Sequence, residues 1–171
     1  RGSISDLLAR PPAVLLLADP GPIKSTVRAA LNVWLERGGV IVRFAGPRLA
    51  RAANSRLLPV KLRRGGRVIG GAMSWRKPES LASFEPSSPF HGLAIPRDVT
   101  VRRQVLAEPA LDLADRTWAK LRDGTPLVTA QARGAGWLIL FHTTASAEWS
   151  NLPLSGLFVE MLRRIVGLSQ G

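Results

Sequence analysis

Two short apolar runs separated by a helix-like stretch constrain the fold of this chain more than any other feature. The first run, residues 13–18, lies between Pro11-Pro12 and the breaker-rich stretch 19–22. A continuous run of this length is typical of a strand buried on both faces, as in a parallel sheet. The second run, residues 40–45, begins after Gly38-Gly39 and ends at Gly46-Pro47. Both runs are predicted to be strands.

The stretch between the two runs predicts an amphipathic helix. Its apolar residues recur with the spacing of one helix face: Val27, Ala30, Leu31, Trp34 and Leu35. Ser25 or Thr26 is a suitable N-cap, and Gly38 can adopt the left-handed conformation that ends a helix. A strand–helix–strand unit with such short connections makes its two strands parallel. We therefore expect one α/β domain with a mainly parallel sheet and helices on both faces.

The middle of the chain is rich in arginine, glycine and proline. A short helix is expected within residues 48–58, with Leu49, Ala52 and Ala53 facing inward. Strands are expected over 60–64 and 67–75, joined by a turn at Gly65-Gly66. Residues 84–98 carry many prolines and serines and predict a loop, whereas 99–106 predicts a further strand. Together these segments predict an antiparallel β excursion in the middle of the chain.

The last third of the chain predicts a hairpin and a helix. A short strand is expected over residues 117–121. Residues 126–132 and 137–143 flank Arg133-Gly134-Ala135-Gly136 and predict a hairpin. Ser155 is a suitable N-cap for a final helix, in which Arg163 and Arg164 are expected to face water. The apolar stripe of that helix comprises Phe158, Met161, Leu162, Ile165 and Val166.

The composition excludes several classes of function. The 171 residues contain no cysteine and only two histidines, so disulfide frameworks, zinc ribbons and cysteine nucleophiles are excluded. Neither a phosphate-binding glycine loop nor a serine nucleophile elbow occurs. We expect no cofactor and no metal, and an enzymatic role is disfavoured. The length fits a single domain over residues 1–171. No apolar run approaches the ~20 residues of a membrane span.

The formal net charge of +12 indicates an attraction to anions. The densest patch comprises Lys61, Arg63, Arg64 and Arg67, and its two interpretations are a polyanion contact site and a solvated turn. Only Trp75 lies nearby to stack on bases, so nucleic acid is not favoured as the partner. An anionic ligand remains a possible partner.

Polar residues follow three of the predicted strands. Asp19 follows the first, Arg48 follows the second, and His142-Thr143 end the last. Ligands bind beyond the carboxyl ends of the strands in open parallel sheets, so Asp19, Arg48, His142 and Thr143 form a candidate ligand-binding rim. The alternatives are ordinary loop polarity and, for His142, a partly buried ring bonded to the backbone.

Two segments carry a resemblance to known families. Residues 30–47, which read ALNVWLERGGVIVRFAGP, resemble the helix-to-strand passage of class I glutamine amidotransferase-like domains. Residues 149–162, which read WSNLPLSGLFVEML, resemble the closing motif of bacterial aerotolerance (BatA-type) membrane proteins. The resemblance implies a flavodoxin-like domain, taken from a longer protein anchored in the bacterial inner membrane. The amidotransferase cysteine is missing, so no catalytic residue is carried over.

These observations leave three functional hypotheses. The first is a non-catalytic binding or scaffolding domain whose partners are other proteins at the membrane. The second is a hydrolase or small-ligand enzyme that uses the rim of Asp19, Arg48 and His142. The third is polyanion binding through the patch at residues 61–67.

Overall fold

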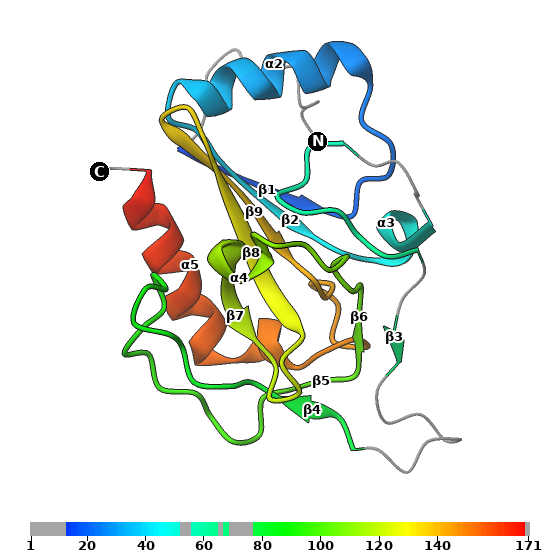
Figure 1. The fold of residues 1–171 in the computed structure, drawn as a ribbon, viewed down its shortest axis with the longest axis vertical. Helices are drawn as coiled ribbons and strands as arrows, with labels where there is room; N and C mark the ends of the chain where they lie inside the picture. Colours follow the sequence, from blue (N-terminus) through cyan, green and yellow to red (C-terminus); the bar gives the residue numbers. More distant parts are fainter. Residues whose placement is uncertain (1–12, 52–55, 65–66, 69–76, 170–171) are drawn as a thin grey trace.

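A five-stranded mixed sheet forms the centre of the computed structural model, which describes residues 13–51, 56–64, 67–68 and 77–169 (Figure 1). The strand order is β1-β2-β9-β8-β7. The strands are β1 (Val14–Ala18), β2 (Val40–Phe44), β7 (Thr117–Lys120), β8 (Pro126–Arg133) and β9 (Gly136–Phe141). Neighbours β1, β2 and β9 are parallel, whereas β8 is antiparallel to both β9 and β7. The expected α/β class with a mostly parallel sheet is therefore confirmed.

The predicted strand–helix–strand unit is present. Strand β1 pairs in parallel with β2, from Val14 opposite Val40 to Ala18 opposite Phe44. The helix between them, α2 (Ser25–Glu36), ends where Gly38 adopts a φ of +110°. The predicted N-cap at Ser25 or Thr26 is wrong, because Lys24 occupies the N-cap position and provides no side-chain hydrogen bond.

Strand β1 differs from its predicted burial. It lies at the edge of the sheet, and its burial alternates: Leu15 and Leu17 are buried, whereas Leu16 is 51% exposed. One face of β1 packs on the apolar cluster that contains Leu31 and Leu35 of α2. The prediction of burial on both faces is wrong because an apolar run also suits an edge strand with one covered face.

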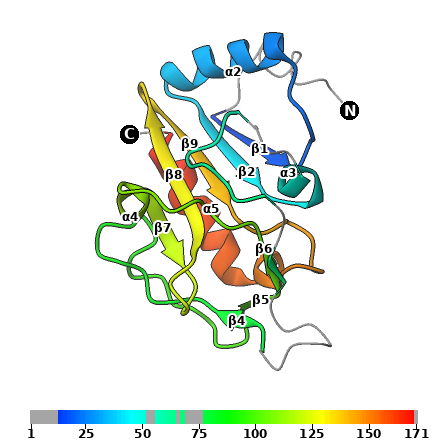
Figure 2. The ribbon, with the colours of Figure 1, turned by 45° about the vertical axis from the view of Figure 1, so that its right-hand side comes forward.

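Helices cover both faces of the sheet. On β2, Val40, Val42 and Phe44 belong to the cluster that includes Met161 and Ile165 of α5 (Gly156–Leu168), whereas Ile41 belongs to the cluster of α2. Successive strand residues point to opposite faces, so α5 and α2 lie on opposite sides. Figure 2 shows α5 behind the β8–β9 hairpin. The predicted N-cap of α5 is confirmed, since the Ser155 hydroxyl accepts the Phe158 N–H at 3.3 Å.

The end of α2 packs closely against the start of β9. The Ala135 N–H donates to the Glu36 carbonyl at 3.0 Å, and the Trp137 N–H donates to the Gly39 carbonyl at 3.1 Å. Between them, a Cβ on Gly136 would meet the carbonyl oxygens of Leu35 and Gly39. Only glycine fits at this contact, which joins the strand–helix–strand unit to the hairpin.

The middle segment, defined here as residues 56–107, contains only short elements where the structure describes it. Its strands are β3 (Arg67–Val68), β4 (Glu79–Ser80), β5 (Thr100–Val101) and β6 (Arg103–Gln104). Outside this segment lie further short elements: α3 (Pro47–Arg51), α4 (Leu113–Arg116) and the 3₁₀ turn η1 (Leu152–Leu154). Strand β3 pairs with β6, and β4 pairs with β5, both antiparallel. The antiparallel excursion is therefore confirmed.

The pairing within the middle segment differs from the prediction. Residues 61–64 lie against residues 106–108, with a bridge between Leu62 and Ala107. The strand expected over 99–106 is interrupted because the N–H groups of Arg102 and Arg103 both donate to the Trp149 carbonyl. The expected inward positions of Ala52 and Ala53, the Gly65-Gly66 turn and residues 69–75 lie outside the described residues.

The middle segment covers the carboxyl edge of the sheet. The Val105 N–H donates to the carbonyl of His142 at 2.8 Å, and the Thr143 hydroxyl donates to the carbonyl of Arg103 at 3.0 Å. Strands β4, β5 and β6 lie together at the lower end of the molecule, where β9 ends (Figures 1 and 2). Of the helices in the described ranges, none has the length and apolar character needed to cross a bilayer.

Candidate functional site

Asp19 and Arg48, two residues of the predicted rim, lie together. The Asp19 carboxylate accepts the backbone N–H groups of Arg48 and Leu49, both at 2.9 Å. The Arg48 guanidinium donates to the Pro20 carbonyl at 3.3 Å. Asp19 thus satisfies the otherwise unpaired amides at the start of α3 and holds that helix against the end of β1. These hydrogen bonds give Asp19 and Arg48 a structural role at the junction of β1 and α3.

His142 and Thr143 do not join this pair at an open rim. Their exposed fractions are 0% and 1%. The His142 ring contacts the Val105 carbonyl through Nδ1 and the Thr129 hydroxyl through Nε2, both at 2.8 Å. A carbonyl can only accept, so Nδ1 carries the proton and Nε2 accepts from Thr129. The alternative of a histidine bonded to the backbone describes His142 correctly.

Burial sets the protonation of His142. Removal from water disfavours the imidazolium and lowers the pKa of His142 to about 4, although the hydrogen bond to Val105 opposes the shift. The ring is therefore neutral at pH 7 and has no free nitrogen for proton transfer. The predicted rim of Asp19, Arg48, His142 and Thr143 is not assembled as an open site, because the middle segment covers the end of β9.

A buried arginine fixes the start of the middle segment. Arg43 on β2 is 3% exposed, and its Nη1 donates to the carbonyls of Arg56 and Leu57 at 3.0 and 2.8 Å. Leu57 has a φ of +65°, which few non-glycine residues adopt. Burial lowers the pKa of Arg43 below its ordinary value, and the charge of Asp19 opposes the shift. Arg43 thus ties the chain after α3 to the centre of the sheet.

The predicted polyanion patch is exposed where it is described. Lys61, Arg63 and Arg64 are all exposed. Arg67 belongs to β3, whose backbone pairs with Gln104, and the side chain of Arg67 lies outside the described residues.

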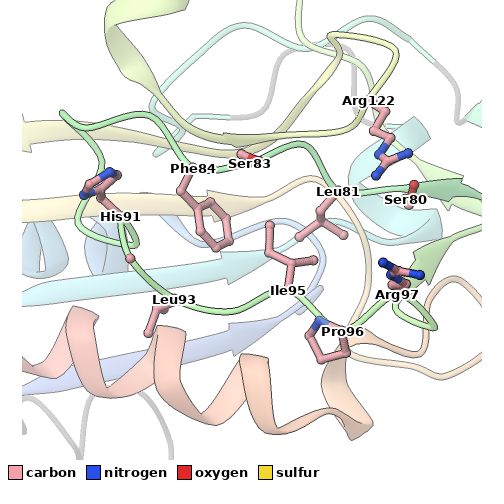
Figure 3. A pocket seen from close by; sticks show the side chains of 11 residues that line it. Ser80, Leu81, Ser83, Phe84, His91, Leu93, Ile95, Pro96, Arg97 and Arg122 are labelled. Atoms are coloured by element: carbon pink, nitrogen blue, oxygen red, sulfur yellow. The ribbon is translucent and has the colours of Figure 1, made fainter.

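A pocket of about 760 Å³ lies between the loop at residues 80–97 and the turn that follows β7. This volume is in the range of small-ligand sites. The lining residues are Ser80, Leu81, Ser83, Phe84, His91, Gly92, Leu93, Ile95, Pro96, Arg97 and Arg122. In Figure 3, Arg122, Ser80 and Arg97 gather at one end and His91 stands at the other, with Phe84, Leu81 and Ile95 between them. None of these residues belongs to the predicted sites.

The pocket combines positive charge with an apolar floor. Its ionisable lining side chains are Arg97, Arg122 and His91, and none of the eleven lining residues is acidic. Leu81 and Phe84 are buried beneath it, at 3% and 8% exposure. Arginine presents a planar fork of donors that matches a carboxylate or phosphate. The arrangement can therefore hold an anion at the arginine end and an apolar group along the floor.

A buried aromatic residue anchors the far wall of the pocket. Phe90 is 0% exposed and meets Phe84 and Trp118 edge to face, with ring centroids 5.6 and 5.9 Å apart. The buried Ser88 hydroxyl donates to the Trp118 carbonyl at 2.7 Å and accepts the Phe90 N–H at 3.1 Å. Arg164 of α5 donates to the His91 carbonyl at 3.3 Å, so it contacts the loop and does not only face water.

The arginine end of the pocket is fixed by backbone pairing. The Arg122 N–H donates to the Ser80 carbonyl at 2.9 Å, and the Ala82 N–H donates to the Lys120 carbonyl at 3.0 Å. On the other side, the Asn151 side chain donates to the carbonyl of Asp98, the residue after Arg97, at 2.6 Å and accepts the Thr100 N–H at 2.8 Å. Both walls are thus held by bonds within the chain, which lowers the entropy cost of ordering them when a ligand binds.

Sequence reasoning missed this pocket because seven of its eleven lining residues lie in the segment 84–98, which was predicted only as a loop. The available signal was the presence of Phe84 and Phe90 among the prolines and serines of residues 84–98. Large aromatic residues in a long loop indicate that the loop packs on the core.

Comparisons with known proteins inform the fold. No protein-family model matches the sequence, and no curated protein matches it. The structure is similar to Cytoplasmic Protein STM3548 from Salmonella typhimurium, with a TM-score of 0.70 at 14% identity over 98% of this chain and 74% of the other. Cytoplasmic Protein STM1381 from Salmonella typhimurium LT2 gives 0.66 at 13% identity over 98% and 75%. A beta-galactosidase from Rahnella sp. R3 gives 0.61 at 13% identity over 91% of this chain and 23% of the enzyme.

These comparisons correct one prediction. The two Salmonella proteins, each matched over nearly the whole of this chain, are described as cytoplasmic, which contradicts the predicted location at the bacterial inner membrane. At identities of 13–14% the likeness concerns the fold alone. The α/β fold of this chain is therefore shared with these three structures.

Proposed function

We propose that this protein is a non-catalytic binding domain that takes a small organic anion in the pocket between residues 80–97 and Arg122. The observation that carries the proposal is a preformed pocket of about 760 Å³ with two arginines, a histidine and no acidic residue in its lining. An anionic group lies between Arg97 and Arg122, and an apolar body lies over Leu81, Phe84 and Ile95.

The side chains favour binding over turnover. General acid–base chemistry needs a proton acceptor and a donor within hydrogen-bond reach of the substrate. The lining offers His91 but no carboxylate to orient it. The second histidine, His142, is buried with both nitrogens engaged. A binding role uses the charges of the pocket and requires no further group.

Isothermal titration calorimetry with octanoate tests the proposal. Octanamide has the same apolar chain without the charge and is expected to bind at least about tenfold more weakly. The variant Arg97→Gln/Arg122→Gln is expected to lose octanoate binding to a similar extent. The control variant Arg37→Gln/Arg163→Gln removes the same net charge from two exposed positions, one directly after α2 and one on α5. Equal binding of octanoate and octanamide, or equal loss in the control variant, contradicts the proposal.

We further infer a flavodoxin-like, three-layer arrangement of the kind found in glutamine amidotransferase-like domains. The parallel strands β1, β2 and β9, with α2 and α5 on opposite faces, support this inference. A crystal structure of the chain tests it. Helices are expected on both faces of the parallel strands, and a second sheet packed on either face would exclude this arrangement.

A further inference from the structure

Positive charge is concentrated in one stretch of the sequence. No acidic residue occurs between Glu36 and Glu79, whereas this interval contains eleven arginines and lysines. Residues 99–107 also lack acidic residues and contain Arg102 and Arg103. The fold brings parts of these two stretches together, on a surface whose residues do not include those that line the pocket.

Antiparallel pairing places the two basic stretches side by side. The Arg63 N–H donates to the Leu106 carbonyl at 2.8 Å, and Leu62 forms a bridge with Ala107. Further along, Val68 of β3 pairs with Arg103 of β6. We name the exposed side chains of this region the basic ladder: Lys61, Arg63, Arg64, Arg102 and Arg103. Adjacent paired strands lie roughly 5 Å apart, so the backbone positions of these five residues follow one another along the same pair of strands.

The side chains of the basic ladder form no ion pair with a carboxylate in the described part of the chain. The ion pairs there involve Arg116, Lys120 and Arg163. No side chain of the ladder bonds to a described carboxylate or carbonyl. At one end of the ladder, Lys61 lines a pocket together with Glu108 and Asp112, and the Glu108 N–H donates to the Lys61 carbonyl. Five exposed cations along one pair of strands repel one another, so a bound polyanion would stabilise them.

The chemistry of the ladder favours phosphate groups. Four of its five residues are arginines, whose guanidinium forks bind phosphate oxygens in pairs. The described aromatic residue beside the ladder, Trp149, is 6% exposed and offers no face on which a base could stack. The surface therefore suits contacts to a phosphate backbone without contacts to bases.

We propose that the basic ladder of Lys61, Arg63, Arg64, Arg102 and Arg103 binds a chain of phosphate groups without sequence specificity. Such a chain occurs in the backbone of duplex nucleic acid and in inorganic polyphosphate. The mode of binding is electrostatic, with release of counterions. This site is independent of the pocket for the small organic anion.

Fluorescence anisotropy with a labelled duplex DNA oligonucleotide tests the proposal, with unlabelled polyphosphate as the competitor. The wild-type affinity is expected to fall steeply as salt rises from 50 to 200 mM. The variant Arg63→Gln/Arg103→Gln is expected to bind about tenfold more weakly at 50 mM salt. The slope of log K against log salt should fall in magnitude by roughly 1.8, about 0.9 for each lost phosphate contact.

Two further variants make the result specific. Arg37→Gln/Arg163→Gln loses the same charge outside the ladder and is expected to bind the DNA within about twofold of wild type. Arg63→Lys/Arg103→Lys keeps the charge and is expected to keep most of the salt slope. Competition by polyphosphate at similar phosphate concentration supports shared phosphate recognition, and DNA binding that resists it limits the site to nucleic acid. Absent wild-type binding, or equal losses in the ladder and control variants, overturns the proposal.

Discussion

The strand–helix–strand unit of residues 14–44 and the middle segment of residues 56–107 are stabilised in different ways. In the unit, periodic apolar residues pack within one short stretch of chain, and β1 and β2 share a continuous ladder. In the described parts of the middle segment, each strand has two residues. That segment depends on buried anchors such as Phe90 and on bonds from Ser88 and Asn151. Helices and strands with periodic apolar residues can therefore be predicted from residues that are close in sequence. The path of an anchored loop depends on contacts with residues that are distant in sequence.

Of the substitutions predicted here, Phe90→Ala in the middle segment should lower the free energy of unfolding most. The substitution removes a fully buried ring that contacts Phe84 and Trp118, so we expect a loss of about 3–5 kcal/mol in the free energy of unfolding. Octanoate binding is lost with the wall of the pocket. Urea denaturation measures the stability. Leu111→Ala, at a fully exposed position, should change it by less than about 0.5 kcal/mol.

Gly136→Ala tests the contact that joins the unit to the hairpin. The added Cβ meets two backbone carbonyl oxygens, which cannot rotate away as a side chain does. We expect a loss of about 3 kcal/mol in urea denaturation. Gly167→Ala on α5 is the control, because nothing lies within 4 Å of its Cβ and alanine favours helix. The control should be neutral or slightly stabilised, and an equal loss in both variants would argue against the close contact.

Acid should weaken the junction between the two regions through His142. Its pKa is about 4 when folded and about 6.5 when unfolded, so the unfolded state binds more protons between these values. The contribution of neutral His142 to the free energy of unfolding is therefore fully present above pH 6.5, and it falls by about 3 kcal/mol as the pH drops to about 4. His142→Gln should flatten this dependence in urea denaturation between pH 7 and 4.5, whereas His91→Gln should not. An unchanged profile in His142→Gln would contradict the assignment.

Ser88→Ala should have the smallest of these effects. It removes a donor to the Trp118 carbonyl and an acceptor for the Phe90 N–H, which leaves both buried groups without that bond. We expect a loss of about 1–3 kcal/mol. Thermal unfolding measures it, with Ser83→Ala at an exposed position as the matched control. A loss near zero for Ser88→Ala would show that the anchor is dispensable.

The parts of the fold that could be predicted from the sequence are those with periodic apolar residues, as in the strand–helix–strand unit. Val27, Leu31 and Leu35 carry a local period that predicts α2, and Gly134 between two apolar runs predicts the hairpin of β8 and β9. The burial of Leu16 could not be predicted, because it depends on which strand lies at the edge.

The site was less predictable than the fold. His142 was placed at the end of a strand, which is correct, but its exposure depends on Val105, which lies 37 residues away in sequence. Arg97 and Arg122 line the same pocket because Leu81 and Leu121 form an isolated β-bridge, which joins the loop at residues 80–97 to the turn after β7. Neither contact leaves a periodic trace in the sequence, since each joins irregular segments through a single pair.

The central position of β9 also matters while the chain is being synthesised. Strand β2 leaves the ribosome long before β9, its neighbour on the inner side of the sheet. At about 5–20 residues per second, the apolar residues of β2 wait roughly 5–20 s for that neighbour. A nascent chain that stops short of residue 136 thus presents an open edge on β2, and we expect such truncated products to aggregate.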